Sequence, residues 1–184
     1  LVSTMDHLLT DLRAATMTKL GQPYGLVDDA AIAVQSGTVV WVGPRADVPQ
    51  EFAKLPQSSH GGRLVTPALI DCHTHVVHGG PPAAEFEMRL TGASYEEVAR
   101  AGGGIISTVR ATRAASVAEL IAAAHPRVDA MIAEGVSVIE VKSGYGLDIE
   151  TELNMLRAAR ALSEHRAVRV VTSFLGAHAV PAEY

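Results

Sequence analysis

The sequence has one cysteine, no long apolar run and no cluster of basic residues, and each of these shortages narrows the possible classes of protein. A single cysteine, Cys72, cannot form an internal disulfide, so a reducing, cytoplasmic setting fits best. No apolar run reaches about 18 residues, so we expect no transmembrane helix. The N-terminus lacks a basic stretch followed by an apolar one, which predicts no signal peptide, and Leu1 in place of an initiator methionine indicates a trimmed start. With a net charge of -5 and a pI of about 5.9, we expect neither nucleic acid nor an anionic membrane as a partner.

The composition is that of an ordinary globular protein. Hydrophobic residues make up 48% of the 184 positions and charged residues 19%, which is enough apolar material for a real core. The length suits one domain or a part of a larger one. We find no internal repeat and no low-complexity tract.

Residues 1–66 read as β-rich. The segment AIAVQSGTVVWVGP, residues 31–44, contains two short apolar strands around Ser36 and Gly37, which is a strong hairpin signal. Three prolines, Pro44, Pro49 and Pro56, then mark a loop.

From residue 67 onward the pattern alternates between strand and helix. Buried strands are expected at 68–75, 136–144 and 167–178, and helices at 94–102, 116–135 and 148–165. The segment 104–114 fits either a helix or a strand, and we favour a helix. Ser116 and Glu119 have the spacing of a capping box, whereas Pro126 predicts a break or kink. In the helix at 148–165 we expect Leu153, Leu156 and Leu162 to face inward. Apolar strands separated by helices predict a parallel α/β sheet. A (β/α)8 barrel needs eight such units, so we expect the three found here to be part of one.

Two histidines stand one residue apart at the end of the first of these strands. Side chains at i and i+2 of a strand point to the same face, so His73 and His75 should project together. At the carboxyl end of a barrel strand they would face the mouth, and neutral imidazoles at this spacing can share one Zn²⁺ or Fe²⁺. Because catalytic zinc usually takes about three or four protein ligands, the remaining ligands must come from elsewhere.

Five segments carry a more specific resemblance. VTPALIDCHTH is similar to the first barrel strand of the amidohydrolase superfamily, with its Asp-x-His-x-His signature. The others resemble the imidazolonepropionase family, and they read EFEMRLTGASYEEVARAGGGI, STVRATRAAS, VKSGYGLDIETELNMLRAAR and RVVTSFLGAHAVP. The resemblance runs from about residue 8 to residue 184. It covers the N-terminal half, or slightly less, of a complete member.

The resemblance implies a fold and a reaction. The expected fold is α/β, part of a metal-dependent (β/α)8 TIM barrel with an N-terminal β-sandwich segment. Residues 1–66 would form the N-terminal part of a composite β-sandwich domain, and residues 67–184 the first three βα units of the barrel. The family opens the imidazolone ring of 4-imidazolone-5-propanoate in histidine degradation, and its members are expected to form homodimers in the cytoplasm.

The resemblance also implies roles for particular residues. His73 and His75 match two ligands of one zinc or iron ion, which activates a water for attack on the ring carbonyl. His178 matches a histidine that binds that carbonyl or stabilises the charge developing on it. Tyr145 and Tyr95 match positions that contact the substrate. A third histidine, an aspartate and a proton-transferring glutamate of the family cannot be located in the 184 residues.

One departure from the family pattern concerns substrate binding. The family usually reads Gly-Gly-Asn-Arg after the first barrel strand, and this arginine contacts the substrate, whereas here Pro82 stands in its place. Proline cannot pair with a carboxylate, and a charged hydrogen bond contributes about 1.5–3 kcal/mol. Substrate capture would then be roughly 10- to 100-fold weaker without compensation. His78, where an apolar residue is common, is a smaller departure.

Several further interpretations stay open. Pro82 is compatible with a related cyclic-amide hydrolase or deaminase of altered substrate. A non-catalytic, truncated remnant is a third interpretation. We expect Lys142 to be structural or to support the site, and Cys72 to be a small buried residue that points away from the two histidines.

Overall fold

The computed structural model describes residues 6–19, 22–80, 90–92, 94 and 105–181. The chain divides into two compact units, Leu1–Ala68 and Leu69–Tyr184. The segment with Pro82 and Tyr95, and most of the helix expected at 94–102, lie outside the described residues.

The first unit is a four-stranded sheet in the order β3-β2-β1-β4. Its strands are β1 (His7–Ala15), β2 (Leu26–Gln35), β3 (Thr38–Pro44) and β4 (Gln57–Val65), with short 3₁₀ turns at Pro23–Gly25 and Arg45–Asp47. The predicted hairpin is confirmed, because β2 and β3 pair antiparallel with Gln35 opposite Thr38. Ser36 and Gly37 both have positive φ angles, 50° and 76°, as the tight turn between two twisted strands requires. β1 also pairs in parallel with β4, which forms the second edge of the sheet.

One surface of this sheet is apolar and hollowed. A depression of about 410 Å³ is lined mostly by small and β-branched side chains of β1 to β4, among them Leu9, Ile32, Val34, Val39 and Val65. Val39 remains 57% exposed, although an apolar sheet face normally packs against another layer. The sandwich expected of residues 1–66 would supply such a layer and stays a prediction.

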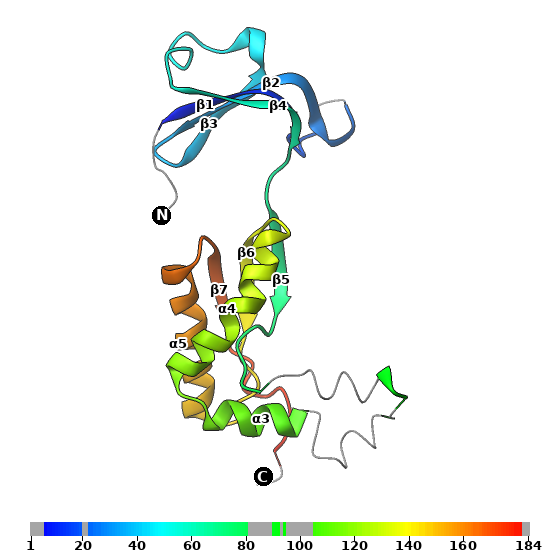
Figure 1. Cartoon of the computed structure of the whole chain (residues 1–184), viewed down its shortest axis with the longest axis vertical. Coiled ribbons are helices and arrows are strands. Elements are labelled where there is room, and N and C mark those ends of the chain that lie inside the picture. Colours follow the sequence, from blue (N-terminus) through cyan, green and yellow to red (C-terminus); the bar gives the residue numbers. More distant parts are fainter. Residues whose placement is uncertain (1–5, 20–21, 81–89, 93, 95–104, 182–184) are drawn as a thin grey trace. The chain divides into compact units, whose positions relative to one another are not determined.

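The second unit is a three-stranded parallel sheet with helices, as the alternating pattern predicts. The strands are β5 (Leu69–Thr74), β6 (Val136–Lys142) and β7 (Arg169–Ser173), in the order β5-β6-β7. The helices are α3 (Ile105–Ala114), α4 (Val117–Ala133) and α5 (Ile149–His165), and α4 and α5 lie side by side along this sheet (Figure 1). Their core joins residues from α4, β6 and α5, including Leu120, Val128, Ile139, Met155 and Leu162.

Two helix predictions meet different outcomes. The capping box of α4 is confirmed, since Ser116 Oγ accepts from the Glu119 N–H at 3.3 Å and Glu119 Oε2 accepts from the Ser116 N–H at 2.8 Å. The prediction at Pro126 was a break or a kink, and the break is wrong, because α4 continues through this residue to Ala133. The apolar face of α4 packs into the core on both sides of the proline, and this packing outweighs one lost backbone hydrogen bond.

The inward face of α5 is turned by one residue from the predicted one. Leu162 is buried as expected, but Leu153 is 41% exposed, and Glu152, Met155, Ala158 and Ala159 face inward instead. Ala158 and Ala159 let the helix approach the sheet closely, which leaves the larger leucine outside. The cost is a buried carboxylate at Glu152.

The first strand of the second unit is correctly placed, but its predicted burial is wrong. Leu69, Ile70 and Cys72 are exposed. Among the described residues β5 has a single neighbouring strand, β6, and the helices cover mainly β6 and β7. Cys72 is therefore not the buried residue that the sequence predicted.

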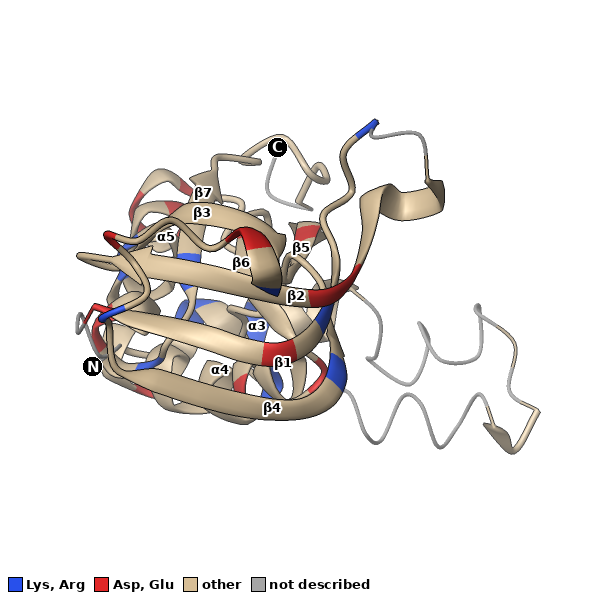
Figure 2. Cartoon of the chain, turned by 90° about the horizontal axis from the view of Figure 1, so that it is seen from above, with Lys and Arg blue, Asp and Glu red and all other residues tan. Residues whose placement is uncertain are grey.

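Charges are mixed along the described elements, with Lys and Arg interspersed among Asp and Glu (Figure 2). Some form exposed ion pairs, such as Arg13 with Asp28 at 2.7 Å, which contribute little to stability. None of the helices that the structure describes is long and apolar enough to cross a bilayer.

Candidate metal centre and active site

The histidine pair lies where strand β5 ends, and its two rings share one side of the strand. Their ring centroids are 5.7 Å apart, as the two-residue period of a strand predicts. Thr74 between them points to the opposite side and donates its hydroxyl to the Glu140 carbonyl at 2.7 Å. The His73 N–H donates to Asp71 Oδ1 at 3.1 Å, which fixes the end of the strand.

The environment of His75 fits a metal ligand. Its Nδ1 is buried and has no hydrogen-bond partner, which is costly unless another group binds there. Burial and the neighbouring His178, His73 and Lys142 lower the pKa of His75, although Glu140 acts in the opposite direction. The neutral imidazole favoured in this way is the form that binds metals. Within the described ranges no third His, Cys, Asp or Glu joins the pair to make a group that could hold a metal ion.

Tyr145 and His178 surround His75. The ring of His178 stacks on His75 with centroids 5.0 Å apart, and Tyr145 lies 5.1 Å from His75 and 5.3 Å from His178. Tyr145 follows β6 and His178 follows β7, so the carboxyl ends of three parallel strands contribute to one cluster. Four of the five residues that the sequence singled out therefore meet in space. The fifth, Tyr95, lies outside the described residues.

A backbone contact sets the orientation of His178. Its Nδ1 lies 3.0 Å from the Gly144 carbonyl, which can only accept, so Nδ1 carries the proton and Nε2 is left for other partners. Gly144 has a φ of 117°, and a Cβ there would come within 2.8 Å of His178 Nδ1. Glycine is required at this position for both reasons.

His78 borders the same cluster. Its ring meets Tyr145 edge-on at 5.9 Å, and burial lowers its pKa despite the contact with the Gly79 carbonyl. Burial also raises the pKa of Tyr145, so the phenol keeps its proton at neutral pH. The Tyr145 hydroxyl is thus available as a hydrogen-bond donor.

Sequence reasoning missed the residues that hold the segment after β5. Arg127 on α4 donates to the Val76 carbonyl at 2.9 Å and to the His78 carbonyl at 3.3 Å. Thr112 on α3 accepts from the Gly79 N–H at 2.9 Å, and Gly79 approaches the Ala111 carbonyl so closely that a Cβ would lie 2.4 Å from it. The glycine pair at 79–80 was the available signal for this close approach.

Lys142 and Glu140 form an ion pair of 2.7 Å on β6. Burial would raise the pKa of Glu140, but hydrogen bonds from Lys142 and Ser173 and the charges of Lys142 and His73 outweigh it and lower that pKa. The charges of Lys142 and Glu140 both act on the pKa of His75, so this ion pair lies near the histidine cluster.

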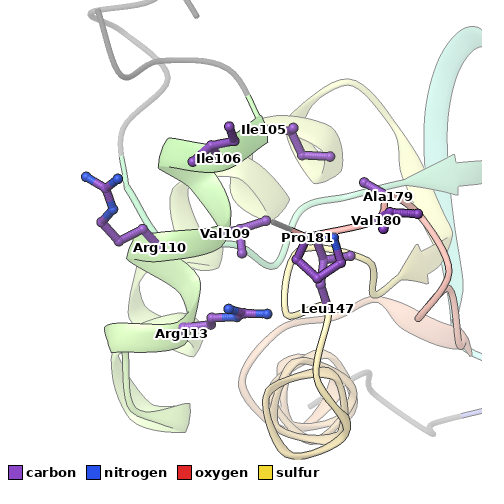
Figure 3. Close-up of a pocket in the computed structure, with 9 residues that line it drawn as sticks. All are labelled: Ile105, Ile106, Val109, Arg110, Arg113, Leu147, Ala179, Val180 and Pro181. Carbon is purple, nitrogen blue, oxygen red and sulfur yellow. The ribbon is translucent and has the colours of Figure 1, made fainter. Parts of the chain in front are cut away.

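A cavity of about 400 Å³ lies between α3 and the segments that follow Tyr145 and His178 (Figure 3). Its lining is mostly apolar and includes Val109, Leu147 and Val180. In Figure 3 the Arg113 side chain points toward Leu147, whereas Arg110 points outward. Two segments that carry candidate site residues thus also line an apolar cavity.

Two solved structures with a similar fold are enzymes. A 5-methylcytosine deaminase from Klebsiella pneumoniae, liganded with 5-fluorocytosine, matches 90% of this chain and 35% of its own, with 16% identity and a TM-score of 0.57. The atrazine chlorohydrolase TrzN from Arthrobacter aurescens, complexed with zinc, matches 91% of this chain and 35% of its own, with 17% identity and a TM-score of 0.53. At such identities the likeness shows the fold alone, and the chain corresponds to about a third of each of these enzymes. No model of a protein family matches the chain.

Sequence relatives are more similar to the chain than the solved structures are. The imidazolonepropionase of Ruegeria pomeroyi is 68% identical over 177 residues, which are 96% of this chain and 44% of that protein. The imidazolonepropionase of Paracoccus denitrificans is 55% identical over 178 residues, 97% of this chain and 44% of that protein. The chain is similar to proteins named imidazolonepropionase and matches their N-terminal portion. It spans less than half the length of these relatives.

Proposed function

We propose that the complete protein hydrolyses the imidazolone ring of 4-imidazolone-5-propanoate to N-formimidoyl-L-glutamate, with one zinc or iron ion per subunit. The reaction breaks a cyclic amide C–N bond by adding water across it. The carrying observation is that the clustered histidines and tyrosine lie within a chain 55–68% identical to proteins named imidazolonepropionase. The substrate is accordingly a small molecule.

His73 and His75 would hold the metal as neutral imidazoles, with the other ligands outside the described residues. The ion supplies Lewis-acid chemistry and makes a water nucleophilic near neutral pH. Asp71 fixes the backbone of His73, and Thr74 fixes the strand between the two ligands. These contacts keep both imidazoles on the same side of β5.

His178 and Tyr145 would bind the substrate. With His178 Nδ1 committed to the Gly144 carbonyl, Nε2 is the atom left to meet the ring carbonyl, where negative charge develops. The phenol of Tyr145 keeps its proton and can donate to a substrate oxygen or nitrogen. Tyr95, on a segment outside the described residues, is proposed as a further substrate contact on sequence grounds.

The role of the Tyr145 phenol is tested by Tyr145→Phe. Losing one neutral hydrogen bond to the substrate should raise KM about 2- to 10-fold and leave metal content unchanged. Steady-state kinetics and metal analysis of the purified variant give both values. Tyr24→Phe is the matched control, since Tyr24 is 72% exposed in the other unit. A KM unchanged in Tyr145→Phe would contradict the role.

Pro82 supports a second candidate, a cyclic-amide hydrolase or deaminase with a different substrate. If the substrate is imidazolone propionate, Pro82→Arg should restore a carboxylate partner and raise kcat/KM roughly 10- to 100-fold. Pro82→Ala separates this gain of charge from the loss of the proline ring. No gain in Pro82→Arg, together with faster turnover of another cyclic amide, favours the second candidate.

A substrate panel tests the proposed function itself. The complete protein is loaded with zinc or with iron and given imidazolone propionate, hydantoin, dihydroorotate and aminated bases. Turnover of imidazolone propionate above all others is the expected result. Turnover of a different compound supports the altered-substrate reading, and no turnover in a folded, metal-bound protein supports a non-catalytic remnant.

A further inference from the structure

We propose that Glu152 is a positioning residue that holds Tyr145 and His178 in register with the histidine pair. This inference rests on the proposed function for its kinetic part only. Glu152 lies on the first turns of α5 and does not itself belong to the cluster. It acts through the loop 143–147, which follows β6.

The carboxylate of Glu152 binds this loop through three backbone N–H groups. Its Oε2 accepts from Gly144 at 2.8 Å, and its Oε1 accepts from Gly146 at 2.7 Å and from Leu147 at 2.8 Å. Glu152 is 1% exposed, so water cannot replace these bonds without opening the core. Tyr145 lies between Gly144 and Gly146, whose N–H groups Glu152 binds, so these two bonds fix the position of Tyr145.

The loop has a backbone shape that needs such support. Gly144 and Leu147 have φ angles of 117° and 57°, and the second is unfavourable for a leucine. Gly146 lies so close to α5 that a Cβ would come within 2.7 Å of the Glu152 N–H nitrogen. A loop with these angles turns its N–H groups inward, and Glu152 satisfies them.

The same loop also sets His178. The Gly144 N–H donates to Glu152, while the Gly144 carbonyl accepts from His178 Nδ1 at 3.0 Å. Ser143 joins the two segments again, since its Oγ accepts from the Leu175 N–H at 3.0 Å. A shift of the loop would therefore move Tyr145. It would also break the hydrogen bond to the Gly144 carbonyl that keeps the proton on His178 Nδ1.

Core packing alone does not explain a carboxylate at this position. The neighbouring inward residues of α5 are Met155 and Leu162, and an apolar side chain of similar size would pack there without the cost of burying a charge. Both oxygens of Glu152 are used by the loop. Outside the core, Arg113 holds the loop from its other side, donating to the Gly146 carbonyl at 2.6 Å.

The test is Glu152→Gln in the complete, metal-loaded protein, with Glu150→Gln as the matched control. The control removes the same charge from an exposed position on the same helix turn. Glutamine keeps one accepting oxygen, but its NH2 group can only donate, so one side of the loop loses its partner. We expect kcat/KM to fall about 10- to 100-fold in Glu152→Gln, with metal content and folding retained, and to stay unchanged in Glu150→Gln.

A spectroscopic measurement reports on positioning without turnover. In ¹⁵N-histidine-labelled protein, the His178 resonances are assigned by their loss in His178→Gln. A hydrogen-bonded Nδ1 proton is expected in the parent protein, and its signal should shift or broaden in Glu152→Gln only. Because this readout needs no substrate, it tests the positioning role even if the proposed reaction is wrong.

Two results would overturn the proposal. One is an unchanged His178 signal with unchanged kcat/KM in folded Glu152→Gln. If that variant does not fold, Arg113→Met decides, because it releases the loop from its half-exposed side. An unchanged His178 signal and unchanged kinetics in Arg113→Met is then the second overturning result.

Discussion

Replacing His75 by alanine in the complete protein should remove the metal and the hydrolytic activity together. The Nδ1 atom of His75 is buried without a partner, and burial keeps the ring neutral. A site with about three or four protein ligands loses much of its affinity with one of them, because the metal retains too few bonds to offset its hydration. Metal analysis should give background levels, and ring opening should fall to the uncatalysed rate.

His73→Ala should behave in the same way, since the two rings lie 5.7 Å apart on one side of β5. His165→Ala is the matched control, because this exposed histidine ends α5 away from the cluster and its loss should change neither value. Full metal content with full activity in either ligand variant would contradict the assignment of the pair.

The 184 residues expressed without further chain should not unfold cooperatively. Large apolar side chains of the second unit are exposed, with Leu69 at 57%, Ile70 at 68% and Phe174 at 62%. Each such side chain, if covered, would contribute about 1.5–3 kcal/mol, and here that stabilisation is missing. β5 and β7 have one neighbouring strand each among the described residues, and open edges of this kind favour aggregation.

Calorimetry, dye binding and light scattering check this expectation. We expect a broad or absent thermal transition, binding of a hydrophobic dye, and aggregates in solution. The complete protein under the same conditions is the control and should show a sharp transition. A monodisperse 184-residue sample with a cooperative transition would contradict the expectation.

The parts of the fold that the sequence predicted are those set by local signals. The turn at Ser36 and Gly37, the helix start at Ser116 and the alternation of strand and helix each depend on a few neighbouring residues. The grouping of His73 with His75 follows from the strand period alone. Tyr145 and His178 were singled out by the family resemblance, and they meet the pair because the ends of parallel strands share one edge.

The parts that failed depend on packing partners that a single sequence does not show. Leu153 was expected inside because it is apolar, but Ala158 and Ala159 determine which face of α5 approaches the sheet, and they bring Glu152 inward. Cys72 is exposed because β5 has only β6 beside it within the described part of the chain. Pro126 stays within α4 because the tertiary core holds both halves of the helix.

The most direct test of the account measures metal content and ring opening in one preparation of the complete protein. The account predicts one zinc or iron ion per subunit and hydrolysis of imidazolone propionate that stops on chelation and returns when the metal is restored. Hydrolysis that survives complete removal of the metal, or one bound ion without any ring opening, would contradict it.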